Sequence, residues 1–350
     1  MTEPTSVDSV AQVTPRPFSA LKAALGLAFT GLVVFVGLEV FWLMSAAPGL
    51  RTGPRLVEIS PGLGLVAVVR RLEAAEVIQN PIGFMALAAA RGTARTLKAG
   101  EYEIPQGASA IAVLALLETG KVVRHPVLLR EGATIADAAK AIEAERLAAA
   151  ADVLRAARDR AFLQTLEIQA DSLEGYLFPD TYQFVKGMTP REMLARMVAR
   201  MREQMPAGAI EAAKARGFSL HQLLTLASII EREAVGPAEM PLISAVFWNR
   251  LKLDMPLQAD PTVQYAVGKE GRALTKSDLQ VESPFNTYRQ TGLPPGPIGS
   301  PGRAAIEAAA RPAAVDYLYF VASRGGKHRF STSLAEHNVA VTQYRLTRPR

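Results

Sequence analysis

Two carboxylates, Glu231 and Glu233, follow an apolar run in the segment TLASIIEREA, residues 225–234. A carboxyl group held against apolar side chains loses the hydration of its charged form, so its pKa rises. A carboxylic acid that stays protonated at neutral pH is the group that general-acid cleavage of a glycosidic bond requires. The segment therefore raises the question of which acid meets the protein core.

Helical geometry favours Glu231 as that acid. Ser219 and Gln222 form the S-x-x-Q capping box, which predicts a helix that starts near Leu220. Because successive residues turn by about 100°, Glu231 falls in line with Leu220 at the edge of the apolar arc. Glu233 points nearly opposite, beside Gln222. The sequence alone also allows a simpler interpretation, in which both acids line the solvated end of a helix.

Other chemistries have weaker support in the sequence. The chain has no Cys, which excludes disulfides, thiolate catalysis and thiolate metal sites. Neither the P-loop pattern nor G-x-S-x-G occurs. The histidines lack the HExxH or HxH spacing of a zinc site, so neither a metal nor an organic cofactor is expected. They are His125, His221, His328 and His337. The remaining possibilities are catalysis by carboxylates or binding without catalysis.

The composition is that of a globular protein with an excess of positive charge. Among 350 residues, 49% are hydrophobic and the net charge is +6. This charge suits an anionic partner such as a phospholipid face or an acidic cell-wall polymer. Dense Lys/Arg runs with interleaved aromatic residues are absent from the sequence, so nucleic acid is not expected as a partner.

The strongest change in composition comes near the N-terminus. Residues 1–20 are polar and predict a disordered tail, whereas 21–45 hold an apolar run long enough to cross a bilayer as a helix. Glu39 is an unusual residue for such a span, although near its end a charge can reach the headgroups. The small residues of 45–47 also allow a cleaved signal peptide, but the long apolar stretch favours an uncleaved anchor. The flanking positive charges are balanced and leave the orientation open.

The rest of the chain predicts an α+β protein in two parts. Residues 55–125 alternate short strands with helices, and Gly120 is a plausible C-cap for the helix that closes this small module. Residues 126–350 form a larger mixed part, which starts with a strand–Gly–helix pattern like that at 56–72. The Ala-rich and charged stretch 136–162 has high helix propensity without a distinctive apolar face. Residues 283–302 are a loop dense in Pro and Gly.

Six motifs in this order resemble the YceG-like family of endolytic murein transglycosylases. They are LEGYLFPDTYQF (173–184), LASIIEREA (226–234), VFWNRLKLDMPLQADPTVQYAVG (246–268), SPFNTYRQTGLPPGPIGSPG (283–302), DYLYFVAS (316–323) and HRFSTSLAEHN (328–338). The resemblance covers roughly residues 56–345. It implies a lyase, a peptidoglycan lytic transglycosylase, with a LysM-like subdomain at 55–125 and a catalytic domain at 126–350.

The resemblance also implies a mechanism with a single acid. Matching the family's SI[IV]E segment places the catalytic acid on Glu231. This group would protonate the oxygen between N-acetylmuramic acid and N-acetylglucosamine, and then accept the proton of the muramic C6 hydroxyl as it attacks C1. The product is a 1,6-anhydroMurNAc end. A muramidase of lysozyme type would instead need a second carboxylate at about 5–9.5 Å, for which Glu174, Asp180 and Asp260 are candidates.

The matched motifs also contain candidate substrate-binding residues. They are Glu174, Gln258, Asp260, Thr262, Tyr265, Asn286, Thr287, Tyr288, His328 and His337. Amides, carboxylates, hydroxyls and aromatic faces together suit a sugar polymer. Each also has a structural interpretation, because Asx-type turns and Pro-rich loops use the same residue types to brace a fold.

The expected location is the bacterial inner membrane, with a single span, the N-terminal tail in the cytoplasm and the catalytic body in the periplasm. The expected partners are peptidoglycan glycan strands and membrane lipid, with peptidoglycan synthases of the elongation or division machinery as candidates. A further alternative is a non-catalytic, membrane-anchored scaffold that binds glycan.

Overall fold

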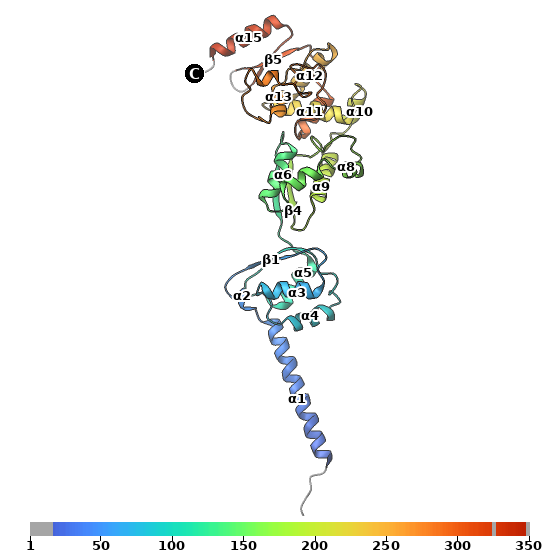
Figure 1. The fold of residues 1–350 in the computed structure, drawn as a ribbon, viewed down its shortest axis with the longest axis vertical. Coiled ribbons are helices and arrows are strands. Elements are labelled where there is room, and N and C mark those ends of the chain that lie inside the picture. Colours follow the sequence, from blue (N-terminus) through green and yellow to red (C-terminus); the bar gives the residue numbers. More distant parts are fainter. Residues whose placement is uncertain (1–16, 324–326, 348–350) are drawn as a thin grey trace, which may run out of the picture. The chain divides into compact units, whose positions relative to one another are not determined.

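The computed structural model describes residues 17–323 and 327–347. The chain divides into two compact units, Met1–Val123 and Arg124–Arg350. Figure 1 traces the elements of each unit. Residues 1–16 of the predicted disordered tail lie outside the described residues, and the first helix begins at Pro17 rather than after residue 20.

The first unit joins a long apolar helix to a small α+β module. Its elements are α1 (Pro17–Met44), α2 (Pro48–Arg51), β1 (Arg55–Ile59), α3 (Leu65–Ala74), α4 (Pro81–Ala90), β2 (Gly100–Ile104) and α5 (Ala110–Thr119). β1 and β2 pair antiparallel with Val57 opposite Tyr102, and both side chains are buried. Gly120 ends α5 with φ of 71°, the left-handed C-cap that the sequence predicts.

Glu39, the acid near the C-terminal end of the apolar helix α1, has a polar partner. Asn80 caps α4 by accepting a hydrogen bond from the Gly83 N–H at 2.8 Å, and its amide donates to the Glu39 carboxylate. The N-terminus of a helix favours negative charge. Glu39 is therefore held by the small module, which explains an acid in a segment that is otherwise apolar.

The second unit carries the candidate site. Its elements are β3 (His125–Leu129), α6 (Ile135–Ala144), α7 (Ala150–Ala156), α8 (Arg160–Thr165), β4 (Asp180–Phe184), α9 (Pro190–Gln204), α10 (Ala209–Lys214), α11 (Leu220–Glu233), α12 (Met240–Lys252), α13 (Asp260–Val267), the short 3-10 helix η1 (Asp278–Gln280), α14 (Arg303–Ala310), β5 (Tyr319–Ala322), β6 (His328–Ser331) and α15 (Leu334–Thr347). The strands form two antiparallel pairs, β3 with β4 and β5 with β6.

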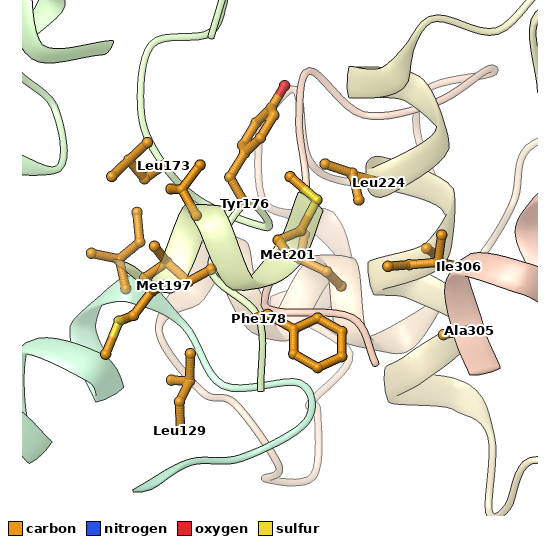
Figure 2. Packing of buried hydrophobic residues seen from close by; sticks show 14 of the residues in the cluster. Leu129, Leu173, Tyr176, Phe178, Met197, Met201, Leu224, Ala305 and Ile306 are labelled. Atoms are coloured by element: carbon orange, nitrogen blue, oxygen red, sulfur yellow. The ribbon is translucent and has the colours of Figure 1, made fainter. Parts of the chain in front are cut away.

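Helix α11 lies at the centre of this unit. Every residue from Leu223 to Ile230 is buried. Figure 2 shows Leu224 of α11 beside Ile306 of α14, and Phe178 and the α9 residue Met201 belong to the same cluster. A helix that is buried all round has a fixed position. The residues at its end are therefore held firmly in place.

The high helix propensity predicted for residues 136–162 is confirmed, but the helical structure is interrupted twice. The segment forms three short helices, α6, α7 and α8, and Arg146 after α6 adopts a left-handed conformation with φ of 55°. These breaks fold the segment back on itself, so that Ile142, Val153 and Phe162 are all buried in one core. Burial of these side chains therefore overrides local helix propensity.

Candidate active site at the end of helix α11

The capping box predicted for α11 is present. The Gln222 N–H donates to the Ser219 hydroxyl at 3.2 Å, and the Ser219 N–H donates to the Gln222 side chain at 2.9 Å. The helix ends at Glu233, and the next residue is extended. The two carboxylates therefore lie in the last turn, where the helix dipole disfavours negative charge.

A loop dense in Pro and Gly runs along one face of α11. Four hydrogen bonds join them: His221 Nε2 with the Pro295 carbonyl at 2.8 Å, the Ile298 N–H to the Ser228 hydroxyl at 3.0 Å, Arg232 Nη1 to the Ile298 carbonyl at 3.3 Å, and the Gly302 N–H to Glu231 Oε2 at 2.8 Å. The bonded residues of α11 recur at helical spacing. The loop is thereby fixed against the helix that carries the acids.

Glu231 is half-buried beneath this loop. Its pKa is raised by burial, lowered by the Gly302 hydrogen bond, and raised again by the charge of Glu131. Glu131 reaches the same glycine, because a Cβ built on Gly302 would lie 2.2 Å from Glu131 Oε1. Two carboxylates thus lie against Gly302, at the N-terminus of α14.

Glu233 is the more strongly perturbed acid. Burial raises its pKa to about 8, and the charge of Asp260 acts in the same direction. The positive charge of Arg250 and a hydrogen bond from the Asp260 N–H partly oppose these effects. Glu233 therefore binds a proton at neutral pH, as a general acid requires.

The helical-wheel argument is wrong about the surroundings of Glu233. It makes Glu231 the acid that meets the core and points Glu233 away from it, beside Gln222, whereas in the structure both acids are half-buried and the pKa of Glu233 is the more strongly raised. Helix α13, which starts at Asp260, packs on α11 from that side. A helical-wheel argument assumes that a helix has one buried face, whereas α11 packs against other helices on several faces. The catalytic role of Glu231 itself stays a prediction.

Three of the predicted substrate-binding residues surround Glu233. Asp260 is exposed, and its Oδ1 accepts a hydrogen bond of 2.6 Å from the Tyr288 hydroxyl. Gln258 is also exposed, has φ of 49°, and its side-chain oxygen accepts a bond of 3.3 Å from Arg250. A strained backbone at such a position is common in functional sites. A carboxylate, an amide and a phenol thus lie around the half-buried acid.

Three other predicted residues are fully buried and hold the loop in place through hydrogen bonds. The Thr262 and Thr287 hydroxyls lie 2.9 Å apart, and the Thr287 hydroxyl also accepts a bond of 3.0 Å from the Ala259 N–H. The Asn286 amide donates to the carbonyls of Leu279 at 3.0 Å and Val281 at 2.9 Å. These contacts position the neighbouring Asp260 and Tyr288, and the three side chains are not free to reach a ligand.

Removal of the Thr287 hydroxyl is expected to cost stability. Thr287→Val keeps the shape but leaves the Ala259 N–H buried without its acceptor, so we expect a loss of about 1–3 kcal/mol in unfolding free energy. Urea unfolding followed by circular dichroism measures this loss. Thr181→Val, at an exposed position in β4, should change stability by less than about 0.5 kcal/mol. Equal effects of the two changes would contradict the assigned role.

The two histidines of the last motif lie in different surroundings. The Glu239 carboxylate accepts from the His328 N–H at 2.8 Å and lies 2.9 Å from His328 Nδ1, which ties β6 to the start of α12. The His337 ring stacks on Tyr319, with centroids 5.2 Å apart, and the Arg250 guanidinium lies 5.3 Å from the centroid of the same Tyr319 ring. Burial lowers the pKa of His337, and so does Arg250. Only His337 is thereby connected to the Glu233 surroundings.

Glu174 and Tyr265 form a separate pair. Glu174 is buried and accepts hydrogen bonds from the Ile135 N–H at 3.1 Å and the Tyr265 hydroxyl at 3.4 Å. Burial raises the pKa of Glu174 to about 7. Both residues line a cavity of about 710 Å³.

Sequence reasoning missed three residues of this region. Arg250 is buried and donates to the carbonyls of Leu318 at 2.8 Å and Leu257 at 2.9 Å, in addition to its contacts near Glu233. Its position among the apolar residues of VFWNRLK could have indicated a buried and paired arginine, because a cation is rarely buried without polar partners. Glu131 and His221 had no such signal, since segments distant in sequence bring them to the site.

Comparison with known proteins places this geometry in a family. The YceG-like family model matches residues 57–343. An endolytic murein transglycosylase of Bacillus subtilis is 34% identical over 303 residues, covering 82% of this chain and 84% of that protein. The chain belongs to the YceG-like family. The family resemblance drawn from the six motifs is thereby confirmed.

Two further family members extend the comparison. A crystal structure of a YceG-like protein from Listeria monocytogenes has a TM-score of 0.58 and 34% identity, and the match covers 82% of this chain and 98% of that one. An endolytic murein transglycosylase of Streptococcus pneumoniae is 35% identical over 178 residues, which is 49% of this chain but 32% of that longer protein. The mixed α+β fold agrees with the class predicted from the sequence.

Proposed function

We propose that this YceG-like protein is an endolytic peptidoglycan lytic transglycosylase. It cleaves the bond between N-acetylmuramic acid and N-acetylglucosamine inside glycan strands and leaves 1,6-anhydroMurNAc ends. The observation that carries the proposal is the pair of half-buried acids in the last turn of α11, one of which, Glu233, lies beside the exposed carboxylate of Asp260. The relatives named endolytic murein transglycosylase support the same reaction.

The acid is assigned to Glu233 in preference to Glu231. Both have raised pKa values, but only Glu233 lies beside Asp260 and interacts electrostatically with Arg250. Glu231 is engaged by the Gly302 N–H and covered by the loop. The sequence-based choice of Glu231 and the structure-based choice of Glu233 make opposite predictions for single substitutions.

The reaction needs one carboxyl group in two roles. Protonated Glu233 donates its proton to the glycosidic oxygen as the bond from C1 to that oxygen breaks. The muramic C6 hydroxyl then bonds to C1 and gives its proton to the Glu233 carboxylate, which restores the acid. No water is consumed, so the proton balance closes within the site.

Muramidase activity is the second candidate. A hydrolase needs another carboxylate near the acid, and Asp260 is exposed and acts electrostatically on Glu233. The other two candidates do not act on Glu233: Asp180 pairs with Arg200 at 2.7 Å, and Glu174 accepts hydrogen bonds from Ile135 and Tyr265. Mass spectrometry of digested peptidoglycan decides between them, because anhydro ends indicate a lyase and reducing ends indicate a hydrolase.

The reaction is expected to slow as the pH rises through about 8. The proton on Glu233 is required, and burial holds the pKa of this group near 8, so kcat/KM should be high at neutral pH and fall about tenfold per pH unit well above the pKa. Turnover of purified sacculi between pH 6 and 10 measures the profile. A rate that stays flat to pH 10 would contradict the requirement for a protonated Glu233.

We also propose that α1 anchors the protein in the inner membrane, with the body in the periplasm. Leu21–Met44 is long and apolar enough to span a bilayer. The small residues that could be cut by a signal peptidase belong to the folded module, because Ala46 pairs with Ser109 and Ala47 is buried. A reporter fused after Arg350 tests the orientation. A reporter active only in the cytoplasm would contradict it.

The small module is proposed to bind glycan as a LysM-like subdomain. Its β1–α3–α4–β2–α5 order and antiparallel strand pair support a compact module of this kind. Its partners would be the same strands that the larger unit cleaves, and peptidoglycan synthases would supply them. This role is tested by comparing how much isolated glycan the full chain pulls down with and without substitutions on α3. Weaker binding by the α3 variants is expected.

A further inference from the structure

A cavity of about 710 Å³ lies in the second unit, apart from the Glu233 cluster. Its walls come from α8, the segment that leads to Glu174, α13 and the Pro-rich loop. This volume is within the range of about 300–1,000 Å³ that ligand pockets have. The cavity is therefore large enough for a ligand.

The polar groups of the cavity are fixed in advance. The Glu174 carboxylate is held by the Ile135 N–H and the Tyr265 hydroxyl. His221 lies 2.9 Å from the Tyr176 hydroxyl through Nδ1 and 2.8 Å from the Pro295 carbonyl through Nε2. A ligand would lose little affinity to ordering of these side chains.

The chemistry of the lining suits a neutral sugar. The rings of Tyr265 and Phe285 lie with centroids 5.0 Å apart, and they offer an apolar surface on which the C–H face of a sugar ring can lie. Gln164 and Gln169 are exposed amides at the rim. Planar amides both donate to and accept from hydroxyl and N-acetyl groups.

The charges of the lining are balanced. Arg160 lies 3.8 Å from Asp171, and burial raises the pKa of Glu174 to about 7, so this acid carries only part of its charge at neutral pH. A strongly ionised ligand such as a peptide stem would find no matching excess of charge. A neutral saccharide fits this balance better.

We propose that this cavity binds a saccharide unit of the same glycan strand, away from the bond that is cleaved. Helix α13 carries Asp260 at its first residue, beside Glu233, and Tyr265 in its second turn. At about 1.5 Å per residue, the two positions differ by roughly 7.5 Å along the helix. The two positions also lie about 140° apart around the helix, so a strand that occupies both places passes around α13. This inference rests on the proposed function for its ligand.

Binding of peptide-free glycan oligomers to the Glu233→Gln protein, measured by calorimetry, tests the cavity without turnover. The double change Gln164→Ala with Gln169→Ala should weaken binding of long oligomers about fivefold or more, because two amide hydrogen bonds are lost. Tyr265→Phe, which removes only the hydroxyl, provides a second and milder variant. Gln290→Ala, at an exposed residue outside the cavity, is the matched control and should bind like the parent.

Each outcome decides the proposal. Unchanged binding in the double variant would overturn it, and so would a loss seen only with strands that still carry peptide stems, which would make the cavity a peptide site. Failure of the parent protein to release anhydro or reducing ends from sacculi would instead overturn the proposed function, while the binding measurement would still report on the cavity.

Discussion

Glu233→Gln is expected to lower the release of glycan fragments from peptidoglycan by about 10²–10⁴-fold, the usual contribution of general acid–base catalysis. The amide keeps the shape of the side chain but cannot give or take the proton. Because Glu233 is the group whose pKa is raised to about 8, its loss removes both the acid and the base step. Chromatography of soluble fragments released from sacculi measures the effect.

Glu231→Gln is the matched control for this change. The substitution is chemically identical and only two positions away, and an amide oxygen can still accept the Gly302 hydrogen bond. We expect a loss of less than about tenfold. The reverse pattern, with Glu231→Gln inactive and Glu233→Gln active, would return the catalytic role to Glu231. If neither change affects release, acid catalysis at this helix end is wrong. A parent that binds strands and releases nothing would support the scaffold alternative.

Glu233→Gln should also stabilise the protein at alkaline pH. The pKa of Glu233 in the folded protein, about 8, lies above its ordinary value of 4.5. Folding therefore favours the protonated form, and the contribution of this group to stability is full below about pH 4.5 and is lost as the pH rises through 8. An amide at this position would carry no charge at any pH. Loss of activity combined with higher thermal stability at pH 9 would separate a catalytic effect from misfolding.

Local sequence rules predicted the elements that position the site. The Ser219–Gln222 box starts α11, and the Thr189 cap with Pro190 starts α9 in the same way. Such signals involve residues three or four positions apart, so they are visible in the sequence. The order of six motifs was sufficient to identify the family.

The surroundings of individual side chains were not visible in the same way. The environment of Glu233 depends on Asp260 and Arg250, and that of Glu231 depends on Gly302 and Glu131. Each pair is brought together by packing between distant segments. Thr262 and Thr287 illustrate the same limit, since a hydroxyl that could bind sugar is instead buried in a pair. The chemical types of the residues indicated the right region. They could not distinguish residues that are free to contact a ligand from residues that only hold the loop in place.

Gly299→Ala is expected to be strongly damaging although it lies outside the two acids. A Cβ at this position would lie 2.5 Å from the Gly132 carbonyl oxygen, and backbone cannot move aside as a side chain can. Two hydrogen bonds join the same two segments, Gly132 N–H to the Ser300 carbonyl at 2.8 Å and Ser300 N–H to the Ala133 carbonyl at 2.8 Å. We expect a loss of about 2–4 kcal/mol in unfolding free energy, from overpacking and weakened bonds.

The effect of Gly299→Ala on activity should be larger than its effect on stability alone implies. The displaced loop carries Gly302, which bonds Glu231, and Ile298, which bonds Arg232 and Ser228. Release of fragments should therefore fall by at least about tenfold at a temperature where the variant is still folded, because catalysis depends on geometry at the scale of an ångström. Gly236→Ala is the matched control, since a Cβ there meets nothing within 4 Å. Parent-like activity in folded Gly299→Ala protein would show that the loop does not position the acids.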